Sequence, residues 1–440
     1  MAQKPSAAPE KTRLLLVLDC SQSMWDKWQS DAKIKVTQKV LLGFLDSIHN
    51  QSDVEVALRV FGHLNKDDFS TRLEVPFESN NYYKLQSKLK TLVPNGGCTA
   101  TTALNSSLKD FPQDNKARNI ILVITDRMDN RENNVCDVAQ QLQRSGNVVR
   151  TFILGIGNRK DFDLADGCVD DFTFLENEES FAEMLHNVFN ISDQKARVTM
   201  TLVNENGIAF ATDVPMAFYD RQTHQVKYAN IYHYSPEDAT DTLVLDPLIT
   251  YDVAIFTKPV TRLYGKHFQG GRYTHLDVTA PQGSLRLSHK GKLGPFQIPV
   301  YSVIVRQHDS TAILASQPID SKKDYLAGRY DIDVMSLPPI KLTNVGIISG
   351  SSTDLQIPLP GQLALSKPKY ATTGSVFAYN KGSLQWVCDL NDDLNDERLV
   401  LMPGEYQVIL KAKGSAEYAA TRTARFTITA AKQTAVVIKN

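Results

Sequence analysis

Residues 12–23 read Thr12-Arg-Leu-Leu-Leu-Val-Leu-Asp19-Cys-Ser21-Gln-Ser23, and this stretch sets the architecture of the N-terminal part of the chain. Its apolar run is typical of a strand buried on both faces, as in a parallel sheet. The polar residues Asp19, Ser21 and Ser23 follow at the point where that strand ends. Ligands of open α/β sheets bind at the carboxyl ends of the strands, so this edge is a candidate functional site.

The residues that follow alternate between strand and helix patterns up to about residue 195. Strand-like runs occur at 54–61, 119–125 and 148–155, and helical periods occur at 34–48, 82–92, 102–111, 135–145 and 179–191. This alternation predicts a doubly wound α/β domain over 12–195, in which helices cover both faces of a mostly parallel sheet. Residues 1–11 are predicted to be a flexible N-terminus.

After about residue 196 the helical period disappears. Short alternating apolar runs separated by turn residues replace it, at 198–202, 251–255, 330–334 and 406–410. This pattern is typical of antiparallel β-sandwiches. We therefore expect all-β, immunoglobulin-like sandwich modules at 196–281, 282–360 and 361–440.

A Gly-x-Tyr repeat runs through this second part. It occurs as Gly271-Arg-Tyr273, Gly328-Arg-Tyr330 and Gly404-Glu-Tyr406. A tyrosine that opens a strand after a sharp turn suits a tyrosine corner, in which the hydroxyl bonds to upstream backbone. We expect Tyr273, Tyr330 and Tyr406 to serve the fold in this way, although stacking on a ligand is the alternative.

Composition and motifs exclude several classes of function. The 440 residues include 48 Lys and Arg against 49 Asp and Glu, and the net charge of -1 argues against a general nucleic-acid binder. Apolar runs are far shorter than the roughly 20 residues of a membrane helix, so no transmembrane segment is expected. The sequence contains no H-E-x-x-H, G-x-S-x-G or P-loop motif, so we expect no enzyme.

Oxygen-bearing side chains from three separate loops are expected to meet at the strand-end edge. Asp19, Ser21 and Ser23 form the first group, Thr99 follows Gly96-Gly-Cys, and Asp126 follows the strand at 119–125. Mg²⁺ prefers such hard oxygen ligands and keeps several waters. Neutral hydroxyls leave positive charge on the ion, so an acidic side chain of a partner protein can complete its coordination. Thr101 and Thr102 are alternatives to Thr99.

On these three segments, residues 12–195 resemble the von Willebrand factor type A domain with its metal-ion-dependent adhesion site. The resemblance implies that Ser21, Ser23 and Thr99 bind Mg²⁺, Mn²⁺ or Ca²⁺ directly, and that Asp19 and Asp126 act mainly through water. It also implies a protein partner that presents an acidic residue. The sequence departs from the family at Gln22 and Arg127, where the family often has Gly. Arg127 would either oppose the metal or attract an acidic partner.

The whole chain is also similar to secreted proteins of the Bacteroidota that place this domain before β-sandwich modules, on residues 23–28, 57–63 and 246–251. This similarity implies a periplasmic or cell-surface setting. The start Met1-Ala-Gln-Lys-Pro5 lacks an apolar signal stretch, and we expect that a native signal peptide has been removed. The expected function is adhesion to, or scaffolding of, a protein partner in the cell envelope. The alternatives are a structural subunit of a membrane-associated envelope or secretion assembly with a vestigial metal site, and a cytoplasmic adaptor of an AAA-type ATPase.

Five further residues are candidates for smaller roles. Trp25 and Trp28 follow the metal loop and, with Arg127, could contact a partner, since aromatic and arginine side chains are enriched at binding hot spots. Packing beneath the next helix is the alternative for both tryptophans. Cys136 and Cys168 are predicted to form a disulfide in an oxidising compartment.

Overall fold

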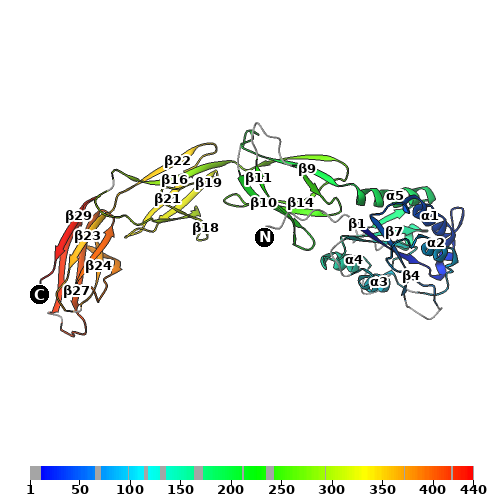
Figure 1. Ribbon diagram of the computed structural model, residues 1–440, viewed down its shortest axis with the longest axis horizontal. Coiled ribbons are helices and arrows are strands. Elements are labelled where there is room, and N and C mark those ends of the chain that lie inside the picture. Colours follow the sequence, from blue (N-terminus) through cyan, green and yellow to red (C-terminus); the bar gives the residue numbers. More distant parts are fainter. Residues whose placement is uncertain are drawn as a thin grey trace. The chain divides into compact units, whose positions relative to one another are not determined.

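The computed structural model describes residues 11–64, 71–97, 99–112, 117–128, 135–162, 172–210, 213–233, 242–292, 294–370, 372–417 and 420–439. The predicted flexible segment 1–11 lies outside these residues except for Lys11, which opens the first strand. The chain divides into two compact units (Figure 1). One comprises Met1–Thr201, Ala211–Ile255 and Arg262–Leu276, and the other comprises Leu202–Phe210, Phe256–Thr261 and Asp277–Asn440.

The N-terminal region is built on a six-stranded sheet with the order β5-β4-β1-β6-β7-β8. All neighbouring pairs are parallel except β4 and β5, which are antiparallel. The strands are β1 (Lys11–Asp19), β4 (Val54–Phe61), β5 (Thr71–Val75), β6 (Ala117–Thr125), β7 (Arg150–Ile156) and β8 (Phe172–Leu175). The predicted α/β sheet is therefore confirmed, and the edge strands β5 and β8 are additions that the sequence analysis did not contain.

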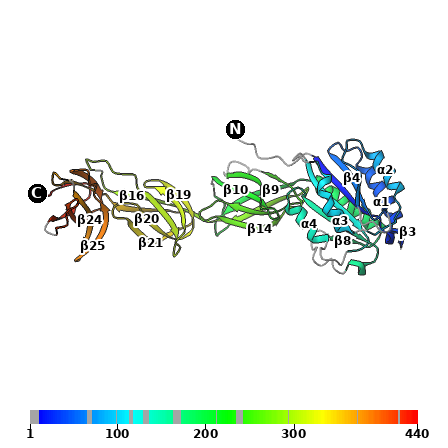
Figure 2. The ribbon, with the colours of Figure 1, turned by 90° about the horizontal axis from the view of Figure 1, so that it is seen from below.

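Helices cover both faces of this sheet, as Figures 1 and 2 show. One face packs against α1 (Lys33–Ile48), α2 (Tyr82–Thr91) and α5 (Glu178–Asp193), and the other against α3 (Ala100–Ser107) and α4 (Val135–Arg144). Successive side chains of a strand point to opposite faces. Accordingly Leu14, Leu16 and Leu18 join the first core, whereas Leu15 and Val17 join the second.

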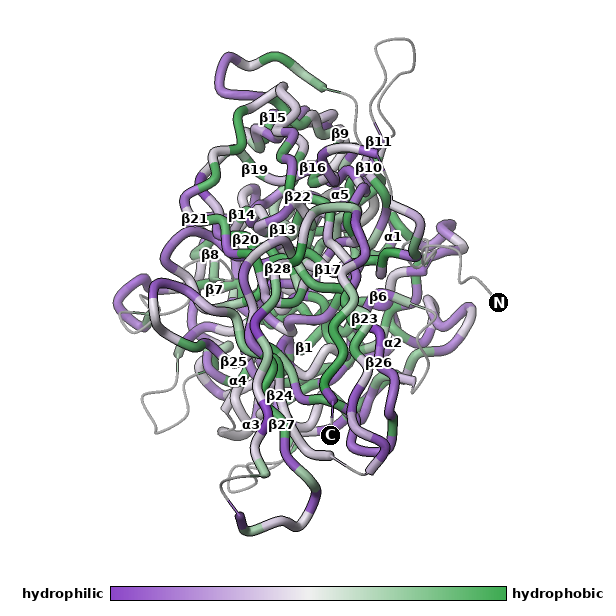
Figure 3. The backbone as a smooth tube through the Cα atoms, turned by 90° about the vertical axis from the view of Figure 1, so that its left-hand side faces the viewer, coloured by the Kyte–Doolittle hydropathy of each residue, from purple (hydrophilic) through white to green (hydrophobic). Residues whose placement is uncertain are grey.

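Short elements complete this region. They are the 3-10 helices η1 (Gln22–Trp25), η2 (Leu108–Asp110) and η3 (Arg159–Phe162), and the two-stranded ribbon of β2 (Lys27–Trp28) and β3 (Asp31–Ala32). The apolar residues of β1 and β6 are buried, and Figure 3, which colours the backbone by hydropathy, shows several largely hydrophilic loops. The apolar runs of the sequence thus become the buried strands.

The remaining strands form three successive pairs of sheets. The first pair has the orders β11-β10-β13-β14 and β12-β9-β15. The second pair has the orders β18-β17-β20-β21 and β19-β16-β22, and the third has β25-β24-β27-β28 and β26-β23-β29. Buried residues of both sheets share one core in the second pair and again in the third, as in a β-sandwich. The predicted all-β, sandwich-like region is confirmed, and the exact module limits remain predictions.

The bounds of these strands are as follows. The first pair of sheets contains β9 (Ala196–Val203), β10 (Asp213–Asp220), β11 (Val226–His233), β12 (Leu243–Leu245), β13 (Thr250–Ile255), β14 (Thr261–His267) and β15 (Tyr273–Thr279). The second contains β16 (Gln282–Lys290), β17 (Ser302–Gln307), β18 (Ile313–Pro318), β19 (Lys322–Leu326), β20 (Gly328–Val334), β21 (Ile340–Ile347) and β22 (Ser352–Pro358). The third contains β23 (Gly361–Ser366), β24 (Thr372–Asn380), β25 (Ser383–Asp389), β26 (Asp396–Leu401), β27 (Gly404–Ala412), β28 (Thr421–Ile428) and β29 (Gln433–Val437).

A buried ion pair joins the α/β region to the β-rich region within the first compact unit. Arg118, near the start of β6, places its Nη1 atom 3.0 Å from Oδ2 of Asp246, and both side chains are buried. Leu248 lies in the same turn and packs into the core beneath α1 and α5. A buried charge needs its partner, so this pair ties the two regions at the edge where the parallel strands begin.

Two of the three predicted tyrosine corners are present. The Tyr330 hydroxyl donates to the carbonyl oxygen of Leu326 at 2.7 Å, and the Tyr406 hydroxyl donates to that of Met402 at 2.6 Å. Both rings are buried in their cores. Each hydroxyl therefore satisfies a backbone carbonyl group four residues upstream.

The third predicted corner is wrong. Tyr273 lies on the edge strand β15 and is 62% exposed. Its hydroxyl contacts the side chain of Thr199, with 2.7 Å to Oγ1. Tyr251 takes the role instead. Its hydroxyl donates to the Asp246 carbonyl oxygen at 3.1 Å and accepts from the Asp246 amide at 3.0 Å. The Gly-x-Tyr signal missed it because no glycine precedes Tyr251 at that spacing.

Replacing Tyr406 by Phe tests the structural role of this hydroxyl. Tyr406→Phe leaves a buried carbonyl unpaired, so the local free energy of opening falls by about 1–2 kcal/mol. Hydrogen exchange of the β24 and β27 amides in the full chain measures this as roughly tenfold faster exchange. The matched control is Tyr370→Phe, because Tyr370 is 39% exposed and precedes β24. Equal effects of the two changes would contradict the prediction.

Candidate metal-ion site

Backbone contacts bring the predicted loops to one edge of the sheet. Ser21, two residues beyond the end of β1, forms a parallel bridge with Gly96, and the Gln22 amide donates to the Gly96 carbonyl at 3.0 Å. Gly62, just after β4, lies so close that a Cβ atom there would stand 2.7 Å from the Ser21 amide nitrogen. Its φ of +74° also favours glycine. Asp126 reaches the same edge because it follows the last residue of β6.

Four of the five predicted metal-binding residues belong to one hydrogen-bonded cluster. Ser21 Oγ lies 3.1 Å from Ser23 Oγ, and Ser23 Oγ donates to Asp126 Oδ1 at 3.0 Å. Asp19 accepts from the Ser21 amide at 2.8 Å and from Thr125 Oγ1 at 2.7 Å. Asp19 is 1% exposed and Asp126 is 2% exposed, so both carboxyl groups are withdrawn from water.

Thr99, the fifth predicted ligand, is the N-cap residue of α3. Its Oγ1 atom accepts from the Thr102 amide at 3.2 Å and lies 2.9 Å from Thr102 Oγ1. Such a cap satisfies a free amide at the start of a helix. Thr99 thus has a structural role, and its role as a ligand, like the choice among Thr99, Thr101 and Thr102, stays a prediction.

The electrostatics of the cluster suit a cation. Burial, followed by the nearby charge of Asp126, raises the pKa of Asp19 from 3.8 to about 6. The hydrogen bonds around Asp19 therefore do not fully compensate the cost of burying its charge. Two hydroxyl oxygens lie beside them, and hydroxyl and carboxylate oxygens are what Mg²⁺ and similar hard ions bind. The residues present fit such an ion.

One residue of this site, Lys33, was not predicted from the sequence. It is the first residue of α1 and is 6% exposed. Its Nζ atom lies 2.8 Å from Asp126 Oδ2 and 3.3 Å from the Ser23 carbonyl oxygen. A signal for it existed, because a lysine is unfavourable at the positive N-terminus of a helix unless an anion lies nearby. That helix also begins at the carboxyl edge of the sheet.

The three candidate partner-contact residues differ in exposure. Trp28 is 7% exposed and packs into the core with α1. It therefore has the alternative role of core packing and offers little surface to a partner. Trp25 is 45% exposed, and its Nε1 atom donates to the Pro94 carbonyl at 3.0 Å. The Arg127 side chain is 57% exposed, with Nε 3.5 Å from Asp126 Oδ1. Trp25 and Arg127 therefore remain candidates for contact with a partner.

The cysteines are placed only in part. Cys136 is disulfide-bonded, whereas its predicted partner Cys168 lies outside the described residues, so this pairing stays a prediction. Cys20, between Asp19 and Ser21, is a buried free thiol. Burial, with the charge of Asp19, raises its pKa to about 12, so the thiol stays protonated and packs as a small apolar group.

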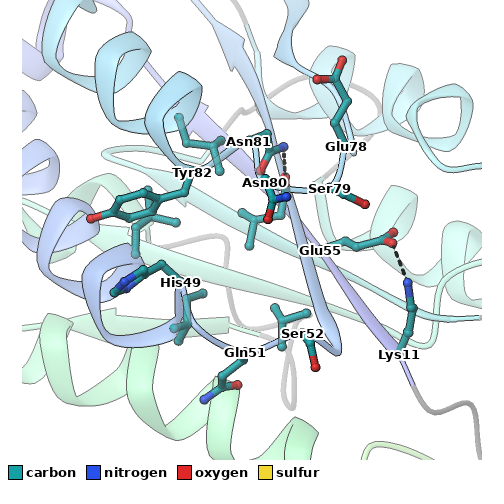
Figure 4. A pocket seen from close by; sticks show the side chains of 15 residues that line it. Lys11, His49, Gln51, Ser52, Glu55, Glu78, Ser79, Asn80, Asn81 and Tyr82 are labelled. Atoms are coloured by element: carbon teal, nitrogen blue, oxygen red, sulfur yellow. Dashed lines mark hydrogen bonds and ion pairs between the residues drawn. The ribbon is translucent and has the colours of Figure 1, made fainter.

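A separate cavity of about 200 Å³ lies at the opposite edge of the sheet, where β1 and β4 begin (Figure 4). Its lining includes apolar residues from α1, β4 and α2. The His49 ring stacks on the Tyr82 ring at a centroid distance of 4.9 Å, and Lys11 Nζ pairs with Glu55 Oε1 at 3.2 Å. The cavity contains none of the predicted metal-binding residues.

The raised pKa of Asp19 predicts how stability depends on pH without metal. The folded chain holds this proton more tightly than the unfolded chain, so the cost of ionisation is absent below about pH 4 and complete above about pH 6. Asp19→Asn removes that cost. In EDTA it therefore raises the free energy of unfolding by about 1–2 kcal/mol at pH 7.5 and leaves it nearly unchanged at pH 4.

Urea unfolding followed by tryptophan fluorescence measures this difference. The chain has three tryptophans, and a Trp386→Phe background leaves only Trp25 and Trp28, which lie next to the site. The control is Asp137→Asn, which alters an exposed carboxyl on α4. The same difference between Asp19→Asn and the parent chain at both pH values would contradict the prediction.

Comparisons with known proteins address the first region. Residues 14–189 match the family model of the von Willebrand factor type A domain. A search of curated proteins found no match. Similar solved structures include the conserved hypothetical protein BatB from Bacteroides thetaiotaomicron, at 15% identity over 40% of this chain and 98% of that chain, with a TM-score of 0.33.

Two pilus proteins are also among the similar structures. The von Willebrand factor domain of the type V pili tip protein Mfa5 from Porphyromonas gingivalis is 13% identical over 41% of this chain and 95% of its own, with a TM-score of 0.33. The pilus adhesin SpaC from Lactobacillus rhamnosus GG is 9% identical over 98% of this chain and 87% of its own, with a TM-score of 0.33. With the family match and the sheet order, the expected resemblance is confirmed: residues 14–189 of this chain are a von Willebrand factor type A domain, and a β-rich region follows it.

Proposed function

We propose that this chain is a non-enzymatic adhesion or scaffold protein that binds a protein partner at the metal-ion site. The observation that carries the proposal is the cluster of Ser21, Ser23 and Asp126 oxygens, linked at 3.1 and 3.0 Å at the carboxyl edge of the sheet. A cluster of this kind, within a von Willebrand factor type A domain, suits a contact in which a partner carboxylate completes the coordination of a divalent ion.

The residues divide this task by their chemistry. Ser21, Ser23 and Thr99 would hold Mg²⁺, Mn²⁺ or Ca²⁺, and the buried carboxyl groups of Asp19 and Asp126 would orient its water ligands. The bound ion supplies a positive centre for the carboxylate of the partner. The exposed guanidinium of Arg127 adds attraction for an acidic partner at the same edge.

A cell-envelope setting, either the periplasm or the cell surface, is part of this proposal. The disulfide at Cys136 supports it, because structural disulfides persist in oxidising compartments and are rare in the cytosol. The same observation counts against a cytoplasmic adaptor of an ATPase. Within the described residues, no helix combines the length and the apolar character needed to cross a membrane.

A second candidate is a structural subunit of a larger envelope assembly whose metal site is vestigial. The observation that favours it is the presence of two cations at the site. Lys33 Nζ lies 2.8 Å from Asp126 Oδ2, and Arg127 Nε lies 3.5 Å from Asp126 Oδ1. These positive charges already compensate part of the carboxylate charge that a divalent ion would neutralise.

The test is capture of a partner from the envelope fraction of the source organism with the full chain as bait. We expect Mg²⁺-dependent capture that EDTA abolishes and added Mg²⁺ restores. Ser21→Ala should reduce capture at least about tenfold, because it removes an oxygen ligand without leaving a charge unpaired. The matched control is Ser87→Ala, an exposed serine on α2, which should capture as well as the parent chain.

The choice of variant matters for this experiment. Removing the carboxyl of Asp126 would leave the buried ammonium of Lys33 without its main partner, and such a loss costs about 3–5 kcal/mol of stability. Loss of capture by an Asp126 variant would then not separate metal binding from folding. Equal capture by the parent chain in Mg²⁺, the parent chain in EDTA and Ser21→Ala would refute the metal-dependent contact and favour the vestigial-site candidate.

A further inference from the structure

We propose that Lys33 is a resident cation of the metal-ion site. Its ammonium group takes up part of the charge of the two carboxyl groups, weakens the binding of a divalent ion, and keeps the site folded when no ion is bound. The inference rests on the proposed function in one respect, namely that the same residues hold the ion.

The Lys33 ammonium group is surrounded by oxygen atoms that stabilise a positive charge. Its Nζ atom lies 2.8 Å from Asp126 Oδ2, 3.3 Å from the Ser23 carbonyl oxygen and 3.5 Å from Asp26 Oδ2. The other oxygen of Asp126 accepts from Ser23 Oγ at 3.0 Å. The Asp126 carboxyl group is thus shared between the ammonium and a predicted metal-binding hydroxyl. A bound ion and Lys33 would therefore both be attracted to the negative charge of Asp126.

The surrounding backbone holds the lysine side chain in this position. Gly157 follows β7 with a φ of +106°, and a Cβ atom there would lie 2.9 Å from Lys33 Cε. The absence of a side chain at Gly157 therefore leaves the space that the lysine shaft occupies. At the start of α1, the Lys33 amide donates to the Asp26 carbonyl at 3.0 Å, and Thr37 Oγ1 donates to the Lys33 carbonyl at 2.8 Å.

The charges at the site show why a divalent ion binds more weakly beside Lys33. Asp19 and Asp126 bring two carboxyl groups, and Lys33 and Arg127 bring two cations. The Arg127 side chain is 57% exposed, so water and salt screen its charge, whereas the Lys33 side chain is 8% exposed and is screened far less. Asp26 is 71% exposed and compensates little. Lys33 is therefore the cation that reduces attraction for a second positive charge.

Removing this charge should have two opposite effects. Without Lys33, a divalent ion meets two uncompensated buried carboxyl groups and binds more tightly. When both Lys33 and the divalent ion are absent, the same carboxyl groups repel each other. The metal-free domain of the variant therefore loses stability. If Lys33 only packed against the start of α1, its replacement would lower the stability of the domain without tightening metal binding.

The experiment titrates Mg²⁺, and Mn²⁺ in parallel, into the metal-free full chain by calorimetry, with no partner present. The variants are Lys33→Met, which keeps the shaft and removes the charge, and Lys33→Arg, which keeps the charge. Lys33→Gln replaces Lys33→Met if the methionine variant does not fold without metal. The control is Lys39→Met on the same helix, where the side chain is 74% exposed and faces Glu178.

We expect Lys33→Met or Lys33→Gln to bind the ion at least about tenfold more tightly than the parent chain. Lys33→Arg and Lys39→Met should stay within about twofold of it. Thermal unfolding should show a larger difference between Mg²⁺ and EDTA for the charge-removing variants than for the parent chain. An unchanged dissociation constant in these variants, or no binding in any chain, would overturn the inference.

The outcomes separate this inference from the proposed function. Tighter binding by the charge-removing variants together with EDTA-insensitive capture by the parent chain supports the role of Lys33 and refutes metal-dependent adhesion. Equal metal affinity of all variants together with EDTA-sensitive capture refutes the role of Lys33 and leaves metal-dependent adhesion standing.

Discussion

The parallel pairing of β1 with β4 on one side and β6 on the other is the constraint on which the site depends. These ladders run along β1 from Thr12 to Asp19 against β4 and from Lys11 to Leu18 against β6. Because all three strands point the same way, Asp19 at the end of β1, Gly62 just after β4 and Asp126 just after β6 arrive at one edge. Gly62 lies close to Ser21 at this edge, where Ser23 Oγ donates to Asp126 Oδ1 and lies 3.1 Å from Ser21 Oγ.

The site is an arrangement of buried charges as much as an arrangement of ligands. A carboxyl pair withdrawn from water needs a positive charge, and the chain supplies one from the first turn of α1. Electrostatic balance therefore does not depend wholly on an ion from solution. This distinguishes the chain from a site composed only of acidic and hydroxyl groups, in which the unbound state is left with its full negative charge.

Much of the fold could be predicted because strands buried on both faces leave long apolar runs, as at Leu14 to Leu18. The edge strands escaped because they are short, with five residues in β5 and four in β8, and because β5 contains the charged residues Arg72 and Glu74. The residues predicted to bind a metal ion came from a motif, whereas Lys33 was missed because its partner Asp126 lies 93 positions away. Tyr251 was missed for a different reason: its partner Asp246 lies only five residues upstream, but no glycine stands two positions before the tyrosine.

One strand of the α/β domain is fixed at both ends. Arg118, near the start of β6, pairs with Asp246 of the β-rich region, and Asp126, just beyond its end, pairs with Lys33. Between them lie residues 119–125 of β6, so the two ends are roughly 26 Å apart along the extended chain. Strand β6 is hydrogen-bonded along both sides, to β1 and to β7. A tensile load carried by the Arg118–Asp246 pair would therefore enter the sheet along the axis of β6, where the hydrogen bonds to β1 and β7 resist it in shear. Strand β6, which the sequence presents only as an apolar run, therefore also connects two buried ion pairs mechanically.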